Sequence, residues 1–479
     1  IADRVERLGE IVPWFTHNAL IHYLSPRGLE QFTGGGWGTR DVTQGPVELL
    51  LASGHTAPIR DLLLRVMQAQ QADGDWPQWF MFLERYRAIR AGDSHGDIVF
   101  WPVLALAQYL IASADASVLD ERVPFFDGPD ATVWEHVERA LAVIERRTIR
   151  GTALAAYGHG DWNDALQPAD PAMREHMCSA WTVTLHHQML TTLARALRTI
   201  GRAKEAQHFE RWAGRVYNDF QRLLIVDGVL AGYALFDGAE VRYLLHPRDQ
   251  VTGVKYSALA MIHALLEDMF TPEQARAHLA LMDEHLLGPD GIRLFDLPMA
   301  YHGGPQHLFQ RAESAAFFGR EIGLMYMHAH LRYVQALAHL GEAERFFRAL
   351  CLANPIGIRR LVPQATLRQA NCYYSSSDAA FEDRYQASAQ YERIRLGTVG
   401  LDGGWRVYSS GAGIAIGLIV RRFLGLNLEA DALSLDPVIP PTLDGLRVEL
   451  ELFGKPLEIT YEIGSVGYGV QAVELNGTS

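Results

Sequence analysis

Apolar residues recur at spacings of three and four along most of this chain, from residue 1 to about residue 424. Such a period is typical of α-helices that bury one face. The polar faces of these segments are thin, as in helices that form concentric layers. The pattern predicts serial helices over Pro46–Gln70, Asp97–Ala112, Ala131–Arg147, Met173–Ile200, Ala203–Leu224, Thr252–Met269, Pro272–Leu286 and Ala315–Leu340.

The pattern changes after Leu426. Leu443–Leu452 and Lys455–Ile463 alternate apolar and polar residues on either side of Phe453-Gly454, which predicts a hairpin, and Tyr468–Leu475 follows in the same manner. From this change we expect a helical domain over residues 1–426 and a small antiparallel β-unit over residues 427–479.

The loops between the expected helices are long and rich in glycine and aromatic residues. They cover Gln31–Gln44, Gly74–Phe82, Ala155–Asp170 and Asp296–Gln310. Long loops in a compact domain are commonly functional, so candidate chemistry is sought there first.

The composition is that of a folded globular protein, with 48% apolar and 21% charged residues. A net charge of −13 disfavours nucleic acid as a partner, because an extended contact with phosphates needs a basic surface. Cys178, Cys351 and Cys372 lie far apart without the spacing of metal ligands, and we interpret them as buried thiols.

Several features bear on the compartment. No run of about 18 apolar residues lacks charges or helix breakers, so we expect no membrane association through a spanning helix. Ile1–Leu8 resembles the middle of an amphipathic helix, with neither an initiator Met nor a secretory hydrophobic region. We therefore expect a cytoplasmic protein and a chain that is a piece of a longer one.

Gly160–Asp164, with the sequence Gly-Asp-Trp-Asn-Asp, combines residue types that suit sugar chemistry. A carboxylic acid such as Asp161 or Asp164 can protonate a glycosidic oxygen, the indole of Trp162 can pack on a pyranose, and Asn163 can orient hydroxyls. Asp and Asn also favour helix caps and turns, so these residues alone leave a purely structural cluster open.

A second cluster, Gly34–Asp41, precedes Gln44. Its glycines lack the Lys and the preceding strand of a phosphate-binding P-loop. Arg40 and Asp41 better suit a clamp on vicinal sugar hydroxyls, since fixed donors stand beside fixed acceptors. A local salt bridge at a helix start is the alternative.

Two further loops repeat this mixture of aromatic and acidic residues. Gly74–Phe80 contributes Asp75 and Trp76, and Asp93–Asp97 contributes Asp97. Aromatic residues between helices are usually core, and we assign Phe80 and Trp101 there.

His328 and His330 lie two residues apart in an expected helix, on different faces, and no Cys or carboxylate completes a ligand set. We therefore expect no metal.

The order of these motifs resembles glycoside hydrolase family 94, the inverting phosphorylases that act on cellobiose, chitobiose and related β-glucans. Gly160–Asp164 matches the family's signature, and His328 heads a segment that ends in Leu340-Gly341, as the family's phosphate-binding His does. Ser409–Gly413 is similar to the family's phosphate turn, and Leu435–Pro440 to its entry into the C-terminal β-unit.

The resemblance implies a mainly α fold, namely an (α/α)6 toroidal barrel followed by a small C-terminal antiparallel β-unit. It implies reversible, inverting phosphorolysis of β-linked gluco-oligosaccharides to α-glucose 1-phosphate. Asp164 would be the general acid and inorganic phosphate the nucleophile and co-substrate, with no cofactor. A second carboxylate is not required, because phosphate is already an anionic nucleophile.

The candidate site therefore has Asp164 as its catalytic residue. Its candidate substrate-binding residues are Arg40, Asp41, Gln44, Asp75, Trp76, Asp97, Asp161, Trp162 and Asn163. Its candidate phosphate-binding residues, implied by the resemblance, are His328, Ser409, Ser410 and Gly411.

Departures from the family pattern point to one branch. Ala165-Leu166 replaces the usual Gly-Met, and Cys372–Asp378 replaces a Tyr-rich segment that bears a Gln. With Trp14–Leu20 and Asp93–Asp97, these features look like the 1,2-β-oligoglucan phosphorylase branch, which implies β-1,2-glucan oligosaccharides as substrates. The family's N-terminal β-sandwich is not visible, and a homodimer is expected if that domain is present.

Three alternatives stay open. One is an inverting hydrolase on the same scaffold, with Glu313 or Asp75 as base. Another is a non-catalytic carbohydrate-binding relative. The third is the phosphorylase-like domain of a cyclic β-1,2-glucan synthase.

Overall fold

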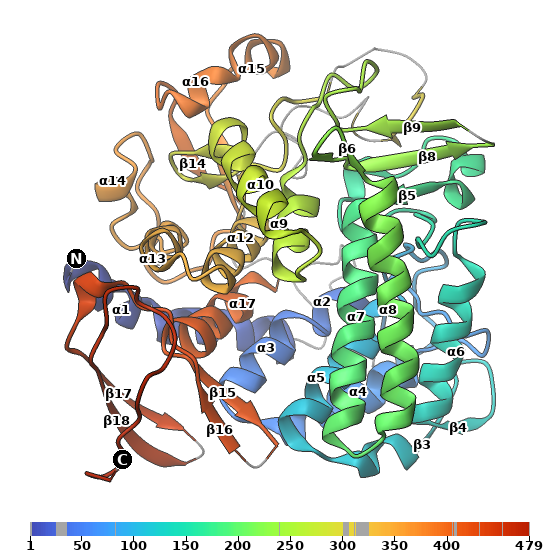
Figure 1. The fold of residues 1–479 in the computed structure, drawn as a ribbon, viewed down its shortest axis with the longest axis horizontal. Coiled ribbons are helices and arrows are strands. Elements are labelled where there is room, and N and C mark those ends of the chain that lie inside the picture. Colours follow the sequence, from blue (N-terminus) through green and yellow to red (C-terminus); the bar gives the residue numbers. More distant parts are fainter. Residues whose placement is uncertain are drawn as a thin grey trace.

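The computed structural model describes residues 2–24, 36–81, 83–238, 240–299, 306–310, 312, 325–404, 406, 410–430, 432–452 and 454–478. This part of the chain is mainly helical, with short antiparallel sheets between the helices (Figure 1). None of the described helices is long and apolar enough to cross a membrane.

Six helices of the described chain contact one another in sequence order, and the last packs against the first, so that they close a ring. They are α3 (Gly45–Ala52), α5 (Phe100–Ser113), α7 (Ala180–Thr199), α9 (Ala258–Leu266), α12 (Met327–His339) and α17 (Gly411–Leu418). Their side chains are largely buried, and every residue of α17 is. This burial explains the thin polar faces in the sequence, because an inner helix contacts neighbours on several sides.

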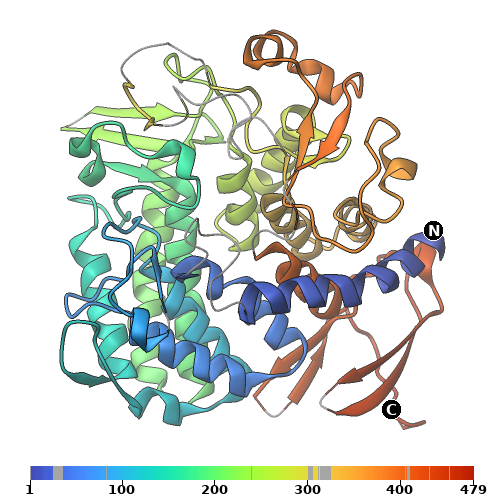
Figure 2. The same cartoon turned by 180° about the vertical axis from the view of Figure 1, so that it is seen from behind.

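Six further helices of the described residues pack outside this ring. They are α1 (Ala2–Leu24), α4 (Thr56–Met67), α6 (Val133–Arg146), α8 (Ala203–Leu223), α10 (Pro272–His285) and α13 (Ala343–Leu352). Each contacts an inner helix next to it, and α1 contacts both α17 and α3 where the ring closes (Figure 2). Capping boxes at Thr132 and Thr271 fix the starts of α6 and α10.

Short elements connect the helices at the two ends of the ring. The helical ones are α2 (Thr39–Val42), α14 (Ile358–Leu361), α15 (Arg384–Gln390) and α16 (Glu392–Arg395). The paired strands are β1 (Trp37–Gly38) with β2 (Trp79–Phe80), β3 (Arg122–Pro124) with β4 (Asp130–Thr132), β6 (Ile225–Val226) with β7 (Val229–Leu230), and β10 (Leu287–Gly288) with β11 (Gly291–Ile292). Two three-stranded sheets join β5 (Met177–Ser179), β8 (Tyr233–Asp237) and β9 (Glu240–Leu244), and β12 (Met325–Tyr326), β13 (Ser376–Ala379) and β14 (Leu401–Gly403).

The C-terminal region consists of two hairpins. β15 (Leu426–Glu429) pairs with β16 (Ala432–Leu435), and β17 (Leu446–Leu452) pairs with β18 (Lys455–Tyr461). The second hairpin lies where the alternating pattern predicts one. Residues 468–475, all of them described, form no strand beyond two isolated bridges, one between Tyr468 and Val438 and one between Leu475 and Thr478.

The expected single helix over Pro46–Gln70 is wrong, because the structure divides it into α3 and α4. Gly54 lies between them with φ of +74°, a left-handed conformation that ends a helix and that glycine adopts without strain. The expected helix over Met173–Ile200 is also too long, since Met177–Ser179 pairs as a strand with β8 and α7 begins only at Ala180.

Candidate active site

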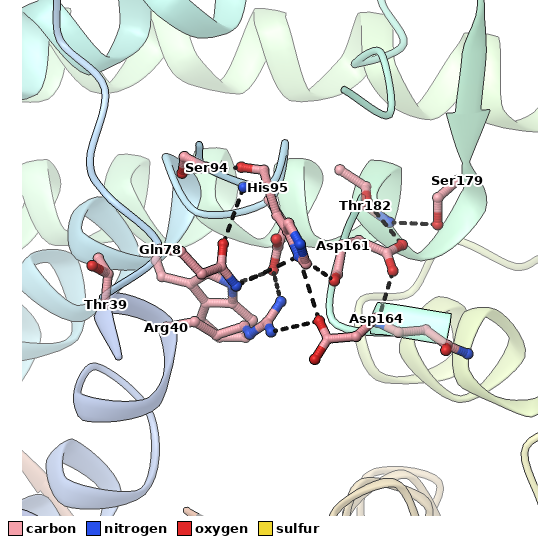
Figure 3. A network of polar contacts seen from close by, with 12 residues as sticks. Thr39, Arg40, Gln78, Ser94, His95, Asp161, Asp164, Ser179 and Thr182 are labelled. Atoms are coloured by element: carbon pink, nitrogen blue, oxygen red, sulfur yellow. Dashed lines mark hydrogen bonds and ion pairs between the residues drawn. The ribbon is translucent and has the colours of Figure 1, made fainter. Parts of the chain in front are cut away.

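The segments that precede the inner helices converge at one end of the ring. Arg40 lies just before α3, Asp97 just before α5, and residues 160–166 lie in the long connection to α7. Figure 3 shows the side chains of Arg40, Asp161 and Asp164 close together in one network of polar contacts. Residues separated by more than a hundred positions therefore share one site, which only the ring brings together.

Arg40 is the central cation of this network. Its Nη1 lies 3.0 Å from Asp97 Oδ2, and its Nη2 lies 3.6 Å from Asp164 Oδ1. Burial alone would lower the pKa of Arg40, but the charges of Asp97, Asp164 and Asp41 raise it above its ordinary value. The sequence suggested a salt bridge with the adjacent Asp41. Instead, the guanidinium bridges two carboxylates from other loops.

Asp164 is the accessible carboxylate of the Gly-Asp-Trp-Asn-Asp segment. Its side chain is 21% exposed, and it begins the short 3-10 turn Asp164–Leu166. Asn163 caps this turn by accepting a hydrogen bond from the Ala165 backbone N–H through its Oδ1, at 3.2 Å. The cap fixes the start of the turn and so directs Asp164 toward Arg40.

Asp161 occupies a different environment in the same segment, because it is only 1% exposed. The Asn163 backbone N–H donates to its Oδ1 at 2.9 Å, and the Thr182 hydroxyl donates to its Oδ2 at 3.3 Å. Burial and the nearby Asp97 raise the pKa of Asp161 to about 7. Its side chain holds the loop that carries Asp164, and its contact with substrate stays a prediction.

His95 belongs to the same network, although nothing in the sequence favoured it over Asp97. Its Nδ1 donates to the Asp161 backbone carbonyl at 2.9 Å and lies 3.5 Å from Asp164 Oδ1. Its Nε2 lies 3.0 Å from Nε2 of Gln167, which fits an acceptor in the neutral ring. Proximity to Gly160–Asp164 was the missing signal, and it arises only from the fold.

Asp97 is completely buried and pairs with Arg40. Its Oδ2 accepts hydrogen bonds from Arg40 Nη1 and, at 2.9 Å, from the indole Nε1 of Trp101. With no exposed surface, Asp97 fixes the position of Arg40. Trp101 lies in the core, as expected from the sequence.

Trp162 faces the start of α12. Its ring centroid lies 5.3 Å from that of His328 and 5.0 Å from that of Tyr326. Burial lowers the pKa of His328 well below its ordinary value, and the positive charges of Arg332 and Arg40 add to this shift. The ring is therefore neutral at pH 7 and carries one N–H donor.

The start of α17 meets the Arg40 segment directly. The Ser410 hydroxyl donates to the Asp41 backbone carbonyl at 2.9 Å, which joins the last inner helix to the first. A side chain at position 411 would collide with the Tyr373 hydroxyl, so Gly411 is required by packing. Ser409 and the alternative base Glu313 lie outside the described residues.

Three expected substrate-binding residues have side chains engaged within the protein, and their contact with substrate stays a prediction. Trp76 is fully buried, and its Nε1 donates to the Val66 backbone carbonyl at 2.8 Å. Asp75 pairs with Arg147 at 2.5 Å, which ties a loop to the end of α6. Gln44 donates to the Arg40 carbonyl at 3.2 Å, and its side chain lines a cavity inside the ring.

The described residues contain no group of three or more His, Cys, Asp or Glu side chains arranged to hold a metal ion. Among the described residues, this end of the ring presents the accessible carboxylate of Asp164, the buried guanidinium of Arg40, the imidazoles of His95 and His328, and the N-terminal ends of helices.

Comparison with known proteins identifies the family. Residues 11–386 match the group described as "Glycosyl hydrolase 94 superfamily, catalytic domain". The chain belongs to glycoside hydrolase family 94. It is 43% identical, over 96% of its length, to the 1,2-β-oligoglucan phosphorylase of Listeria innocua. It is 23% identical, over 92% of its length, to a cyclic β-(1,2)-glucan synthase of Rhizobium meliloti.

This family 94 chain spans only part of those relatives, 43% of the Listeria protein and 15% of the synthase. Among solved structures, a family 78 rhamnosidase of Bacillus sp. GL1 aligns over 90% of this chain and 37% of its own, with a TM-score of 0.55 and 13% identity. At that identity the likeness concerns the fold alone.

Proposed function

We propose that this chain carries the catalytic site of an inverting phosphorylase that cleaves β-1,2-linked gluco-oligosaccharides and releases α-glucose 1-phosphate. The observation that carries the proposal is the contrast between two carboxylates in one loop. Asp161 is buried and bonded within the protein, whereas Asp164 is accessible and lies beside Arg40 and His95. The 43% identity to the Listeria 1,2-β-oligoglucan phosphorylase supports the linkage.

In this mechanism, Asp164 donates its proton to the glycosidic oxygen as the bond from that oxygen to the anomeric carbon breaks. A phosphate oxygen forms the new bond to the same carbon from the opposite face. The β-glycoside thus becomes an α-phosphate by a single displacement, and the leaving sugar departs with the proton from Asp164. Phosphate supplies the nucleophile, so no protein base is needed.

Phosphate would lie at the N-terminal ends of α12 and α17, between His328 and the Ser409–Gly411 turn. Helix N-termini present unpaired backbone N–H groups and a positive dipole end, which favour anions. Arg40 and Asp41 would hold the terminal glucose, with Trp162 and Asn163 beside it. Because Ser410 already donates to Asp41, its hydroxyl would have to rotate to bind phosphate.

The finer architecture also belongs to this proposal. The closed ring with helices packed outside it supports an (α/α)6 toroid followed by a β-unit from residue 427. We propose inorganic phosphate as the co-substrate, with no cofactor, a homodimer when the N-terminal domain is present, and a cytoplasmic location.

The test supplies α-glucose 1-phosphate with sophorose, laminaribiose or cellobiose to the full native polypeptide and measures phosphate release. Release with sophorose above the other acceptors is expected. Cleavage of the oligosaccharide at equal rates with and without phosphate would instead favour the hydrolase. The similarity to a cyclic β-(1,2)-glucan synthase supports a second candidate function, in which this chain is a domain that trims glucan within a larger enzyme. Membrane segments upstream in the complete gene would support that role.

A further inference from the structure

A second cavity lies inside the ring, and Asp164 does not line it. It encloses about 440 Å³. Its walls come mainly from the later turns of α5, α7, α9 and α12, and Thr43, Gln44 and Trp101 line it on the side toward Arg40. The β15–β16 hairpin and the turn after α17 complete the wall. This volume lies in the range of small-molecule sites, and nothing in the proposed phosphorolysis uses it.

Two adjacent arginines distinguish this cavity. Arg421 and Arg422 line it from the π-helical turn Ile419–Phe423, and such turns are rare and frequently mark functional sites. Arg421 Nε donates to Asn427 Oδ1 at 3.3 Å. Burial lowers the pKa of Arg421, and the charge of Arg422 lowers it further. Across the described chain, neither guanidinium lies within 4.0 Å of a carboxylate.

Two of the four carboxylates on the described wall are paired with other arginines. Glu48 pairs with Arg332 at 2.6 Å, and Glu429 pairs with Arg195 at 2.8 Å. Both acids act on Arg421 through their charge, but each already balances the arginine to which it is paired.

The other acids do not balance the two cations either. Burial and the nearby Asp268 raise the pKa of Glu267 to about 8, so this group is mostly uncharged at neutral pH. Among the described lining residues, Asp436 is therefore the remaining carboxylate that could balance the charges of the two guanidinium groups. Unbalanced charge in a buried cavity is unfavourable, and a bound anion would relieve it.

Side-chain amides share this cavity with the two arginines. Gln108, Gln188 and Gln335 line the same cavity, and Gln335 already accepts a hydrogen bond from Arg332 through its Oε1 at 2.8 Å, which leaves its NH2 group as a donor. Amides combine a donor and an acceptor at fixed spacing, which suits hydroxyl groups. Guanidinium groups suit phosphate oxygens, which they can bind in pairs.

We infer that this cavity binds a small polyhydroxylated anion of the sugar phosphate class, separately from the site at Asp164. Arg421 and Arg422 hold the phosphate, and the glutamine amides hold the hydroxyls. The inference does not depend on the phosphorolysis proposed above, because it uses none of the residues around Asp164.

Calorimetric titration of the full native polypeptide with glucose 6-phosphate tests this inference, with inorganic phosphate and glucose as separate probes. We expect saturable binding of glucose 6-phosphate that is weakened about tenfold or more in Arg422→Gln, since a charge-assisted contact is lost. Arg422→Lys, which keeps the charge, should retain more affinity than Arg422→Gln. Arg276→Gln, an exposed arginine paired with Glu273, is the matched control and should bind as the wild type does.

Two outcomes would overturn the inference. One is the absence of saturable binding by the wild-type protein. The other is binding that survives Arg422→Gln but is lost in His328→Asn, which would assign the ligand to the Asp164 end of the ring. Circular dichroism of each variant establishes that it is folded. Failure here would leave the phosphorolysis assay unaffected, so the two proposals fail separately.

Discussion

Nη2 of Arg40 lies 3.6 Å from Oδ1 of Asp164, while Nη1 of the same guanidinium is bonded to the buried Asp97. Asp97 fixes the position of the cation, and the cation faces the accessible carboxylate. A general acid must carry a proton, so binding of the sugar to Arg40 is expected to weaken this contact as the reaction begins.

Asp164→Asn should lower the rate of phosphorolysis by about 10²- to 10⁴-fold, the usual contribution of a general acid. The amide keeps the shape of the side chain, so oligosaccharide binding should change little. Phosphate release measures the rate, and calorimetry measures the binding. Activity that stays near the wild-type level would move the proton donor to another residue.

His95 should position Asp164 rather than contact substrate. We expect His95→Ala to reduce kcat about tenfold or more with little change in KM, because the Asp161 carbonyl loses its donor and the loop is less well held. His95→Asn places an amide N–H near the position of Nδ1 and should recover part of kcat. Equal activity in Ala and Asn variants, or a rise in KM alone, would contradict a positioning role through that donor.

Removal of Arg40 should destabilise the protein, because Asp97 is left as an unpaired buried charge. The expected loss for Arg40→Ala is about 3–5 kcal/mol of unfolding free energy. Urea denaturation measures it. The matched control is Arg248→Ala, whose partner Asp227 is exposed, and it should cost no more than about 1 kcal/mol.

Asp161 should give the protein a distinctive dependence of stability on pH. Its pKa is about 7 in the folded state, above the ordinary value of 3.8 for an aspartic acid. The folded state therefore binds more protons between these values, and this group's contribution to stability is present at acid pH and falls as pH rises toward 7. The slope for a single group is about 1.4 kcal/mol per pH unit.

Asp161→Asn removes this titration while keeping a similar shape. Relative to wild type, the variant should gain unfolding free energy as the pH rises from about 4 to 7, as measured by denaturation at several pH values. The exposed Asp120→Asn variant should follow wild type throughout. A difference between Asp161→Asn and wild type that does not vary with pH would show that Asp161 does not titrate in this range.

His328→Asn tests the proposed phosphate site. A hydrogen bond to a charged partner contributes about 1.5–3 kcal/mol, so KM for phosphate should rise about tenfold to a hundredfold. KM for the oligosaccharide should change less. His208→Asn, on the exposed face of α8, serves as the control and should leave both constants unchanged. A larger effect on the oligosaccharide than on phosphate would reassign His328 to the sugar.

The helices were predictable because burial on the ring imposes a strong period on α5, α6, α8 and α10, whose bounds lie within a few residues of those expected. Helix breaks that depend on the backbone conformation of a single residue, such as the break at Gly54, were not predictable. The candidate site was only partly predictable, because aromatic and acidic residues occur together in cores as well as in sugar sites. Trp76 and Trp162 each follow an Asp in a loop of this kind. Trp76 donates a hydrogen bond within the core, whereas Trp162 packs against His328.

The bond from Ser410 to the Asp41 carbonyl also bears on how the chain folds. It joins positions about as far apart in sequence as any in the ring, so closing that loop carries a high entropic cost and depends on the intervening helices. Until α17 is in place, α3 lacks its neighbour and exposes apolar surface. We expect late docking of α17 to be the slow step of folding, and nascent chains without it to be prone to aggregation.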